Sequence, residues 1–372
     1  PALRRRAGPR PGPARGGIGR PLSTRPAGHG TSRRMPDMLH PRLLNGRTGD
    51  PALHVEVPHQ AEALLLDCGD LSALAPRHLL RIGALGVSHA HMDHWAGFDA
   101  LLRVLIGREK VVQVVGPPGF AQRLSHRLHS YTWNLVDRIA ADLVFEVTEV
   151  TGDAAWPRSR FRLRTGFAAE ALPPGPAVAD GTVLALGALR LRARLLDHGI
   201  PVLGFAVEAA GHLNVRGARL AARGLPTGPW LAGLKRAVAD GAPDDTPIPV
   251  FARPSAAAGA PTLPLAGLRD LVQATPGQRL AYLTDLADTA ANRAAAIALA
   301  RDADMLFIEA PFAAADAAHA LDRRHLTTRA AGEIARAAGA TRIEPFHFSP
   351  RYEDAEARLL AEVLAAAGRL PP

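Results

Sequence analysis

Cysteine and aromatic residues are scarce in this sequence, and long apolar runs are missing. Cys68 is the single cysteine among 372 residues, so the chain can form neither an intramolecular disulfide nor a cluster of thiolate metal ligands. Such sparse cysteine fits a reducing compartment, and we expect a cytoplasmic protein. No run of 18 apolar residues occurs and the Arg-rich start has no apolar core, so we expect neither a membrane span nor a secretion signal.

Acidic residues are absent from the first 34 positions, which hold nine arginines. The rest of the chain has 35 basic and 35 acidic residues, so the whole formal charge of +9 lies in this Pro, Gly and Arg-rich segment. We expect residues 1–34 to form a disordered basic tail, because they contain too few apolar side chains for a core. At 47% hydrophobic residues the chain can form a large core, which we place in a single domain over 35–372.

Apolar runs and helical spacing predict a mixed structure beyond this tail. Residues 52–67 read as a hairpin, and residues 211–278, rich in Gly and Pro, read as an arm or excursion from the core. Helices are predicted over 94–107, 288–301 and 327–339. Strands are predicted over 83–89, 111–116, 143–150, 161–167, 184–198, 279–285, 304–310 and 341–348. This pattern indicates a layered α/β domain with sheets inside and helices outside.

Four candidate metal ligands, His89, His91, Asp93 and His94, lie within six residues. His89 and His91 end a predicted strand and point the same way, because side chains in a strand repeat every two residues. Imidazole and carboxylate groups are the donors that borderline cations such as Zn²⁺ take. A strand-to-helix junction with this density of ligands therefore predicts a site for a pair of divalent ions.

The HxHxDH run, preceded by Asp67-Cys68-Gly69, resembles the first metal motif of the metallo-β-lactamase-fold hydrolases. Later segments resemble the family's other motifs in order: Asp197-His198-Gly199-Ile200-Pro201, Tyr282-Leu283-Thr284-Asp285 and Pro345-Phe346-His347-Phe348-Ser349-Pro350-Arg351-Tyr352. The last match is close to the ribonuclease Z pattern. The resemblance covers about 39–360 and implies a four-layer αβ/βα sandwich of the metallo-β-lactamase fold with an inserted arm.

The same resemblance implies two divalent metal ions, expected to be Zn²⁺ with Mn²⁺ as the alternative. One ion would be held by His89, His91 and His198. The other would be held by Asp93, His94 and His347, with Asp285 bridging both. In such a site Asp93 would also orient or deprotonate the attacking water.

Two further segments favour the ribonuclease Z branch over thioesterases and lactonases of this fold. Residues 224–235, GLPTGPWLAGLK, resemble the stretch beside the arm that grips tRNA in ribonuclease Z. His325-Leu326-Thr327 and Glu309-Ala310 resemble two motifs of the branch, and they imply that His325 donates a proton to the leaving oxygen while Glu309 steadies it. Ile308 departs from the pattern, which has His there. Substrate contacts are implied for Gly228, Pro229, Lys235 and Arg351.

Three functions are compatible with these motifs. The first is a dinuclear phosphodiesterase of the ribonuclease Z kind that trims the 3′ ends of precursor tRNA and forms a homodimer, as relatives often do. The second keeps the metals but acts on a small diester, a cyclic nucleotide, a lactone or a thioester. The third is a nucleic-acid-binding protein with a vestigial site, which the complete ligand set disfavours.

Overall fold

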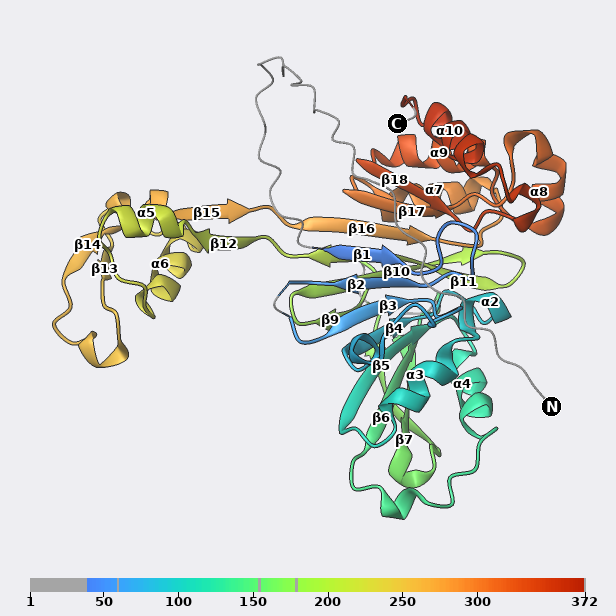
Figure 1. The fold of residues 1–372 in the computed structure, drawn as a ribbon, viewed down its shortest axis with the longest axis horizontal. Helices are drawn as coiled ribbons and strands as arrows, with labels where there is room; N and C mark the ends of the chain where they lie inside the picture. The colour runs from blue at the N-terminus through green and yellow to red at the C-terminus, as the bar shows by residue number, and fades with distance from the viewer. Residues whose placement is uncertain (1–38, 59, 153–154, 178–179, 371–372) are drawn as a thin grey trace, which may run out of the picture. The chain divides into compact units, whose positions relative to one another are not determined.

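A computed structural model describes residues 39–58, 60–152, 155–177 and 180–370. The predicted basic tail over 1–34 lies outside the described residues. In the part that is described, two large sheets and the helices beside them follow one another along the chain (Figure 1).

The first sheet contains eight strands in sequence order. Its strands pair in parallel from β3 to β6 and antiparallel elsewhere. The strands are β1 (His40–Leu43), β2 (Leu53–Glu56), β3 (Ala63–Leu66), β4 (Ile82–Gly86), β5 (Lys110–Gly116), β6 (Leu143–Glu149), β7 (Ala155–Arg162) and β8 (Ala169–Pro176).

The second sheet contains six strands in the order β18-β17-β16-β11-β10-β9. Its β16, β17 and β18 are parallel, and the remaining pairs are antiparallel. The strands are β9 (Thr182–Leu186), β10 (Leu189–Asp197), β11 (Pro201–Ala209), β16 (Gln278–Leu283), β17 (Met305–Glu309) and β18 (Arg342–Phe346).

Three buried apolar clusters bind these elements into four layers. One cluster lies between the sheets, where Leu64 and Leu66 of the first sheet meet Phe205 and Phe307 of the second. Another packs the first sheet against α1 (Pro76–Leu79), α2 (Met92–Trp95), α3 (Phe98–Leu105) and α4 (Phe120–Leu128). The last packs the second sheet against α7 (Ala290–Ala300), α9 (Thr328–Ala338) and α10 (Glu356–Ala366). The predicted αβ/βα sandwich is thereby confirmed.

Local sequence signals explain where several elements begin and end. The Thr327 side chain accepts a hydrogen bond from the Ala330 amide at the start of α9, and the helix ends at Gly339, whose φ is +70°. In β10 the buried Leu189, Leu191 and Ala193 face the other sheet, as their alternation with arginines predicts. The ends of α9 and the buried face of β10 could therefore be predicted from neighbouring residues in the sequence.

Three predicted elements differ from the structure. The helix expected over 94–107 is two helices, α2 and α3, separated at Ala96–Gly97. The strand expected over 184–198 is a hairpin of β9 and β10, because the chain turns at Gly187 with a φ of +56°. The strand expected over 161–167 ends at Arg162, where a 3-10 turn follows.

The segment between β11 and β16 has an apolar cluster of its own. It contains β12 (His212–Val215), α5 (Gly217–Ala222), α6 (Trp230–Ala239), β13 (Pro247–Pro249), β14 (Thr262–Pro264), β15 (Val272–Thr275) and short turns. Trp230, Leu234 and Leu271 are among its buried residues, and β12 pairs with β15. In Figure 1 this yellow and orange segment continues from the ends of β11 and β16. We call residues 212–275 the arm.

None of the helices in the described ranges combines the length and the apolar character that crossing a lipid bilayer requires.

The remaining helix, α8 (Ala317–Arg323), follows β17 and precedes the loop that carries His325.

Candidate metal centre and active site

The candidate site residues follow the ends of strands in both sheets. In the first sheet Asp67 follows β3 and His89 follows β4; in the second, Asp285 follows β16 and His347 follows β18. The carboxyl ends of parallel strands meet at one edge of a sheet, so each sheet contributes its polar side chains at one edge. The antiparallel β10 adds His198 at its own carboxyl end.

Three of these residues adopt a left-handed backbone conformation within two residues of the ends of their strands. The φ angles are +55° at Asp67, +43° at Asp285 and +60° at His347. A non-glycine residue in this region costs about 1–3 kcal/mol and persists where the surroundings hold it, typically at functional sites. The turns direct these side chains into one cluster rather than onward along the strands.

All seven predicted metal ligands come together in the structure. Asp285, which is 2% exposed, divides them into two groups with its two carboxylate oxygens. Its Oδ2 lies 3.5 Å from His89 Nε2 and 3.7 Å from His198 Nε2. Its Oδ1 lies 3.3 Å from His94 Nε2 and 3.1 Å from His347 Nδ1. Two sets have ligand atoms that all lie within 4.8 Å of one another. The first set is His89, His91, His198 and Asp285, and the second is Asp93, His94 and His347.

The chemistry of these side chains fits divalent cations. His89 Nε2, His94 Nε2 and His347 Nδ1 are buried without a hydrogen-bond partner, which is costly unless a cation takes their lone pairs. Burial lowers the pKa of His89 to about 3, so its imidazole is neutral and can act as a ligand. Burial alone would raise the pKa of Asp93, but hydrogen bonds from His347 and His94 hold it far below the usual range. Asp93 is therefore an anionic oxygen donor.

The ring nitrogens on the far side of three ligands have fixed partners. His94 Nδ1 lies 2.9 Å from Asp67 Oδ2, His89 Nδ1 lies 3.0 Å from Ser88 Oγ, and His198 Nδ1 donates to the Arg324 carbonyl at 2.8 Å. Such contacts select the tautomer that leaves the other nitrogen free for a cation. The ligands are thus oriented before any cation binds.

Asp67 is the centre of the largest of these networks. Its Oδ2 accepts hydrogen bonds from Ser88 Oγ and Tyr282 Oη, each at 2.9 Å, in addition to the His94 contact, and its Oδ1 accepts from the Ser88 amide at 2.7 Å. All four side chains are fully buried. The sequence motifs contained Asp67 and Tyr282, but nothing in their spacing indicated that they touch.

Replacing Asp67 by Asn is expected to weaken metal binding about 10- to 100-fold. In either orientation the amide NH₂ of Asn faces a donor, either the Ser88 amide or His94 Nδ1, and the His94 ring loses its fixed position. Competition with a chromophoric chelator measures the affinity. Tyr282→Phe is the matched control, because it removes one donor while keeping the His94 contact, and its loss should be smaller. An unchanged affinity in Asp67→Asn contradicts the positioning role.

The buried Glu309 and the partly exposed His325 form a pair beside the seven ligands. Glu309 Oε1 accepts from the Leu286 and Leu326 amides at 3.0 Å, and Oε2 lies 2.7 Å from His325 Nδ1. Burial alone would raise the pKa of Glu309, but His325 lowers it to about 2. Burial alone would lower the pKa of His325, and Glu309 raises it instead.

The Glu309 and His325 pair also belongs to a third set of possible metal ligands. Asp285, Glu309, His325 and His347 offer ligand atoms within 4.8 Å of one another. The oxygens of Glu309, however, are already engaged by two amides and by His325. The pair is therefore better suited to hold and orient a proton on His325 than to bind a metal.

The cluster opens into a groove of about 480 Å³. Its lining includes Thr48, Gly49 and Asp50 from the loop after β1, and Phe312, Arg323 and His325 from the segment after β17. Thr48, Gly49, Asp50, Phe312 and Arg323 belong to no sequence motif, and only the fold brings them to the cluster.

The predicted substrate-binding residues lie elsewhere. Gly228, Pro229 and Lys235 are in the arm, at the start and middle of α6. A side chain at Gly228 would come 2.2 Å from the Phe251 carbonyl oxygen, so close packing alone requires glycine there. Arg351 lies over the Phe312 ring at 5.9 Å, next to the groove.

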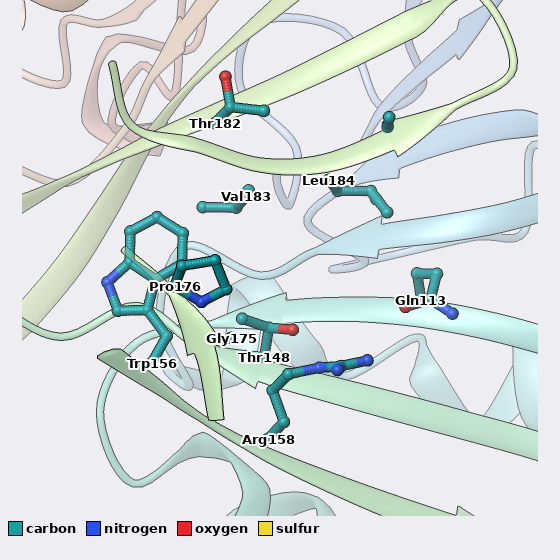
Figure 2. A pocket seen from close by; sticks show the side chains of 10 residues that line it. Gln113, Thr148, Trp156, Arg158, Gly175, Pro176, Thr182, Val183 and Leu184 are labelled. Carbon is teal, nitrogen blue, oxygen red and sulfur yellow. The ribbon is translucent and has the colours of Figure 1, made fainter. Parts of the chain in front are cut away.

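A second depression, of about 360 Å³, is lined by residues of both sheets (Figure 2). Trp156 and Arg158 of β7 and Thr182 of β9 line it. Arg158 is paired there with Glu146 at 3.4 Å. No residue that lines this depression belongs to the His and Asp cluster, so it is separate from the metal centre.

The four-layer sandwich and the His and Asp cluster at the strand ends define a metal-dependent hydrolase of the metallo-β-lactamase fold. The chain is similar to ribonuclease Z of Deinococcus radiodurans, with 35% identity over 340 residues that cover 90% of this chain and 96% of the relative. It is also similar to ribonuclease Z of Salinibacter ruber, with 31% identity covering 80% and 79% of the two chains. The chain belongs to the ribonuclease Z family.

Solved structures with a similar arrangement are more distant. They include a metallo-β-lactamase fold protein from Bacillus subtilis, with 14% identity, a TM-score of 0.46 and coverage of 82% of this chain and 85% of that one. The short form of human tRNase Z has 16% identity and a TM-score of 0.46, covering 84% and 92% of the two chains. No protein-family model matches the chain.

Proposed function

We propose that this protein is an endoribonuclease that cleaves precursor tRNA at its 3′ end. The observation that supports it most is the convergence of seven metal-ligating side chains from four chain segments, with Asp285 at their centre, in a chain of the ribonuclease Z family. A vestigial site would not keep three buried imidazole nitrogens of one cluster without hydrogen-bond partners.

Two divalent ions are proposed to occupy the cluster, with Zn²⁺ favoured by the nitrogen-rich ligands and Mn²⁺ as the alternative. His89, His91 and His198 would hold one, and Asp93, His94 and His347 the other, with Asp285 shared. Such ions supply positive charge to the phosphate oxygens and acidify water at neutral pH.

The protein's own groups then supply orientation and protons. Asp93 is anionic and half-buried in the groove, so it can accept a hydrogen bond or a proton from the attacking water. His325, held by Glu309 through Nδ1, has its Nε2 available to protonate the departing ribose 3′-oxygen. The buried Glu309 carboxylate stabilises the charged imidazole that carries this proton.

Replacing the arm by a short turn tests the tRNA substrate. Ala209 and Gln278 face each other in the β11–β16 ladder, so a Gly/Ser turn can join them without disturbing the sheets. We expect cleavage of a precursor tRNA with a 3′ trailer to fall at least about 10²-fold, because the arm's contacts with the distant part of the RNA are lost. Hydrolysis of bis(nitrophenyl) phosphate, which needs only the metal centre, should continue.

The measurement is kcat/KM for both substrates before and after the replacement. Equal loss on the two substrates would show that the arm supports the core rather than the RNA. Absence of precursor-tRNA cleavage by the intact protein, with rapid hydrolysis of the small diester, would instead favour the alternative small-diester function.

We further propose that residues 35–372 act as one domain, with an excursion at about 211–278 that contains the arm. We also propose that the protein works as a homodimer and acts in the cytoplasm. Sedimentation at several protein concentrations measures the oligomeric state directly. A monomer at all concentrations would contradict the dimer.

A further inference from the structure

We propose that Arg323 binds the phosphate one nucleotide to the 5′ side of the scissile phosphate. The inference rests on the proposed function and assigns a phosphodiester subsite to the groove wall beside His325. None of the metal-binding motifs includes this arginine, which lies at the end of α8, two residues before His325.

Arg323 is a free cation in the groove. Its nearest ion-pair contact in the described residues is with Asp322 Oδ2 at 3.9 Å, and the Asp322 side chain is 76% exposed. An exposed pair at that distance contributes little, so the Arg323 guanidinium keeps nearly all its capacity for another anion. Among the described residues that line the groove, Arg323 carries the single Arg or Lys side chain.

The position of His325 fixes which side of the RNA meets Arg323. His325 lines the groove and its Nδ1 is occupied by Glu309, so only Nε2 can reach the leaving oxygen. The leaving oxygen belongs to the nucleotide on the 5′ side of the cleaved bond. That nucleotide therefore lies against the wall formed by Phe312, Arg323 and His325, and its own 5′ phosphate is the nearest anion beyond the cluster.

Asp50 gives another part of the groove lining the opposite charge. No hydrogen bond or ion pair of its carboxylate is found in the described part of the chain, and it lies near Asp93. An additional phosphate beside Asp50 would meet repulsion, whereas one beside Arg323 meets a guanidinium whose fork matches phosphate oxygens. The groove thus sets the direction in which an RNA strand enters.

A neutral phosphate analogue tests this contact. Precursor tRNA is assembled with a single methylphosphonate at the linkage to the 5′ side of the cleaved one, and kcat/KM is measured for the unmodified protein and for Arg323→Gln. Either change alone should lower kcat/KM about tenfold, as expected when a charge-assisted hydrogen bond is lost. The two changes together should lower it no further than one of them, because they remove the same contact.

Arg329→Gln is the matched control, since Arg329 is an exposed arginine of α9 outside the groove. It should cleave the all-phosphate RNA normally and keep the full sensitivity to methylphosphonate. Additive effects of Arg323→Gln and methylphosphonate, or no effect of Arg323→Gln, would overturn the proposal. If the unmodified protein does not cleave precursor tRNA, the proposed function itself fails, and this subsite with it.

Discussion

Asp285→Ala should abolish turnover on every substrate, with a fall in kcat of at least about 10³-fold. Metal ions lower the barrier of phosphodiester hydrolysis by several kcal/mol, and each 1.36 kcal/mol corresponds to a factor of ten in rate. Asp285 is the group whose two oxygens face both histidine sets, so its loss affects both cation sites at once.

The same variant should lose bound metal. Elemental analysis of the unmodified protein, purified without chelator, should give two divalent ions per chain, and the Asp285→Ala variant should give fewer than one. Asp137→Ala, an exposed carboxylate far along the chain from any ligand, is the matched control and should keep both. The variant is expected to fold, because the carboxylate belongs to none of the three sandwich cores.

Two outcomes would contradict this role. An unmodified protein that contains no metal, and gains no activity on addition of Zn²⁺ or Mn²⁺, would refute a metal-dependent reaction. An Asp285→Ala variant that keeps two ions with little loss of rate would show that the two sites do not share this carboxylate.

Motifs that are contiguous in sequence could be predicted well. The HxHxDH run at His89–His94 has enough ligands within six residues to indicate a metal site by itself. The ligands His198, Asp285 and His347 came from the family resemblance, since each is a single residue in a short motif. That they meet at one place depends on the two sheets, whose packing is a long-range property.

Contacts that no motif records could not be predicted. Tyr282 and Asp67 are separated by more than 200 positions, and their hydrogen bond forms because β3 and β16 face each other across the central core. Asp50 likewise reaches the groove from a loop and Arg323 from the end of α8, and neither belongs to a motif. The turn at Gly187 was hidden in an unbroken apolar alternation, so one strand was predicted where there are two.

The pair of His325 and Glu309 could be predicted in part from the sequence. Glu309 was expected to steady His325 although Ile308 replaces the His of the family's motif. The structure puts Glu309 Oε2 2.7 Å from His325 Nδ1, while the two backbone amides on Oε1 fix the carboxylate. Ile308 lies in the apolar cluster under α9, so this position contributes packing rather than chemistry.

His325→Ala should slow the cleavage of precursor tRNA about 10²- to 10⁴-fold and leave bis(nitrophenyl) phosphate hydrolysis nearly unchanged. A general acid gives this acceleration only when the departing oxygen is basic, as a ribose 3′-oxygen is, whereas nitrophenolate leaves without a proton. Glu309→Gln should act in the same direction but less strongly, because the imidazole remains while the carboxylate that stabilises its charged form is removed.

The comparison requires kcat for both substrates at equal metal content, since His325 lies beside two ligands, with ring centroids 4.7 Å from His198 and 5.7 Å from His347. A loss of metal would slow both substrates alike, and the ratio of the two kcat values separates that effect from loss of the acid. If His325→Ala slows both equally at full occupancy, or slows neither, the proton does not come from His325. The residue would then serve only the start of α9, where Thr327 already supplies the cap.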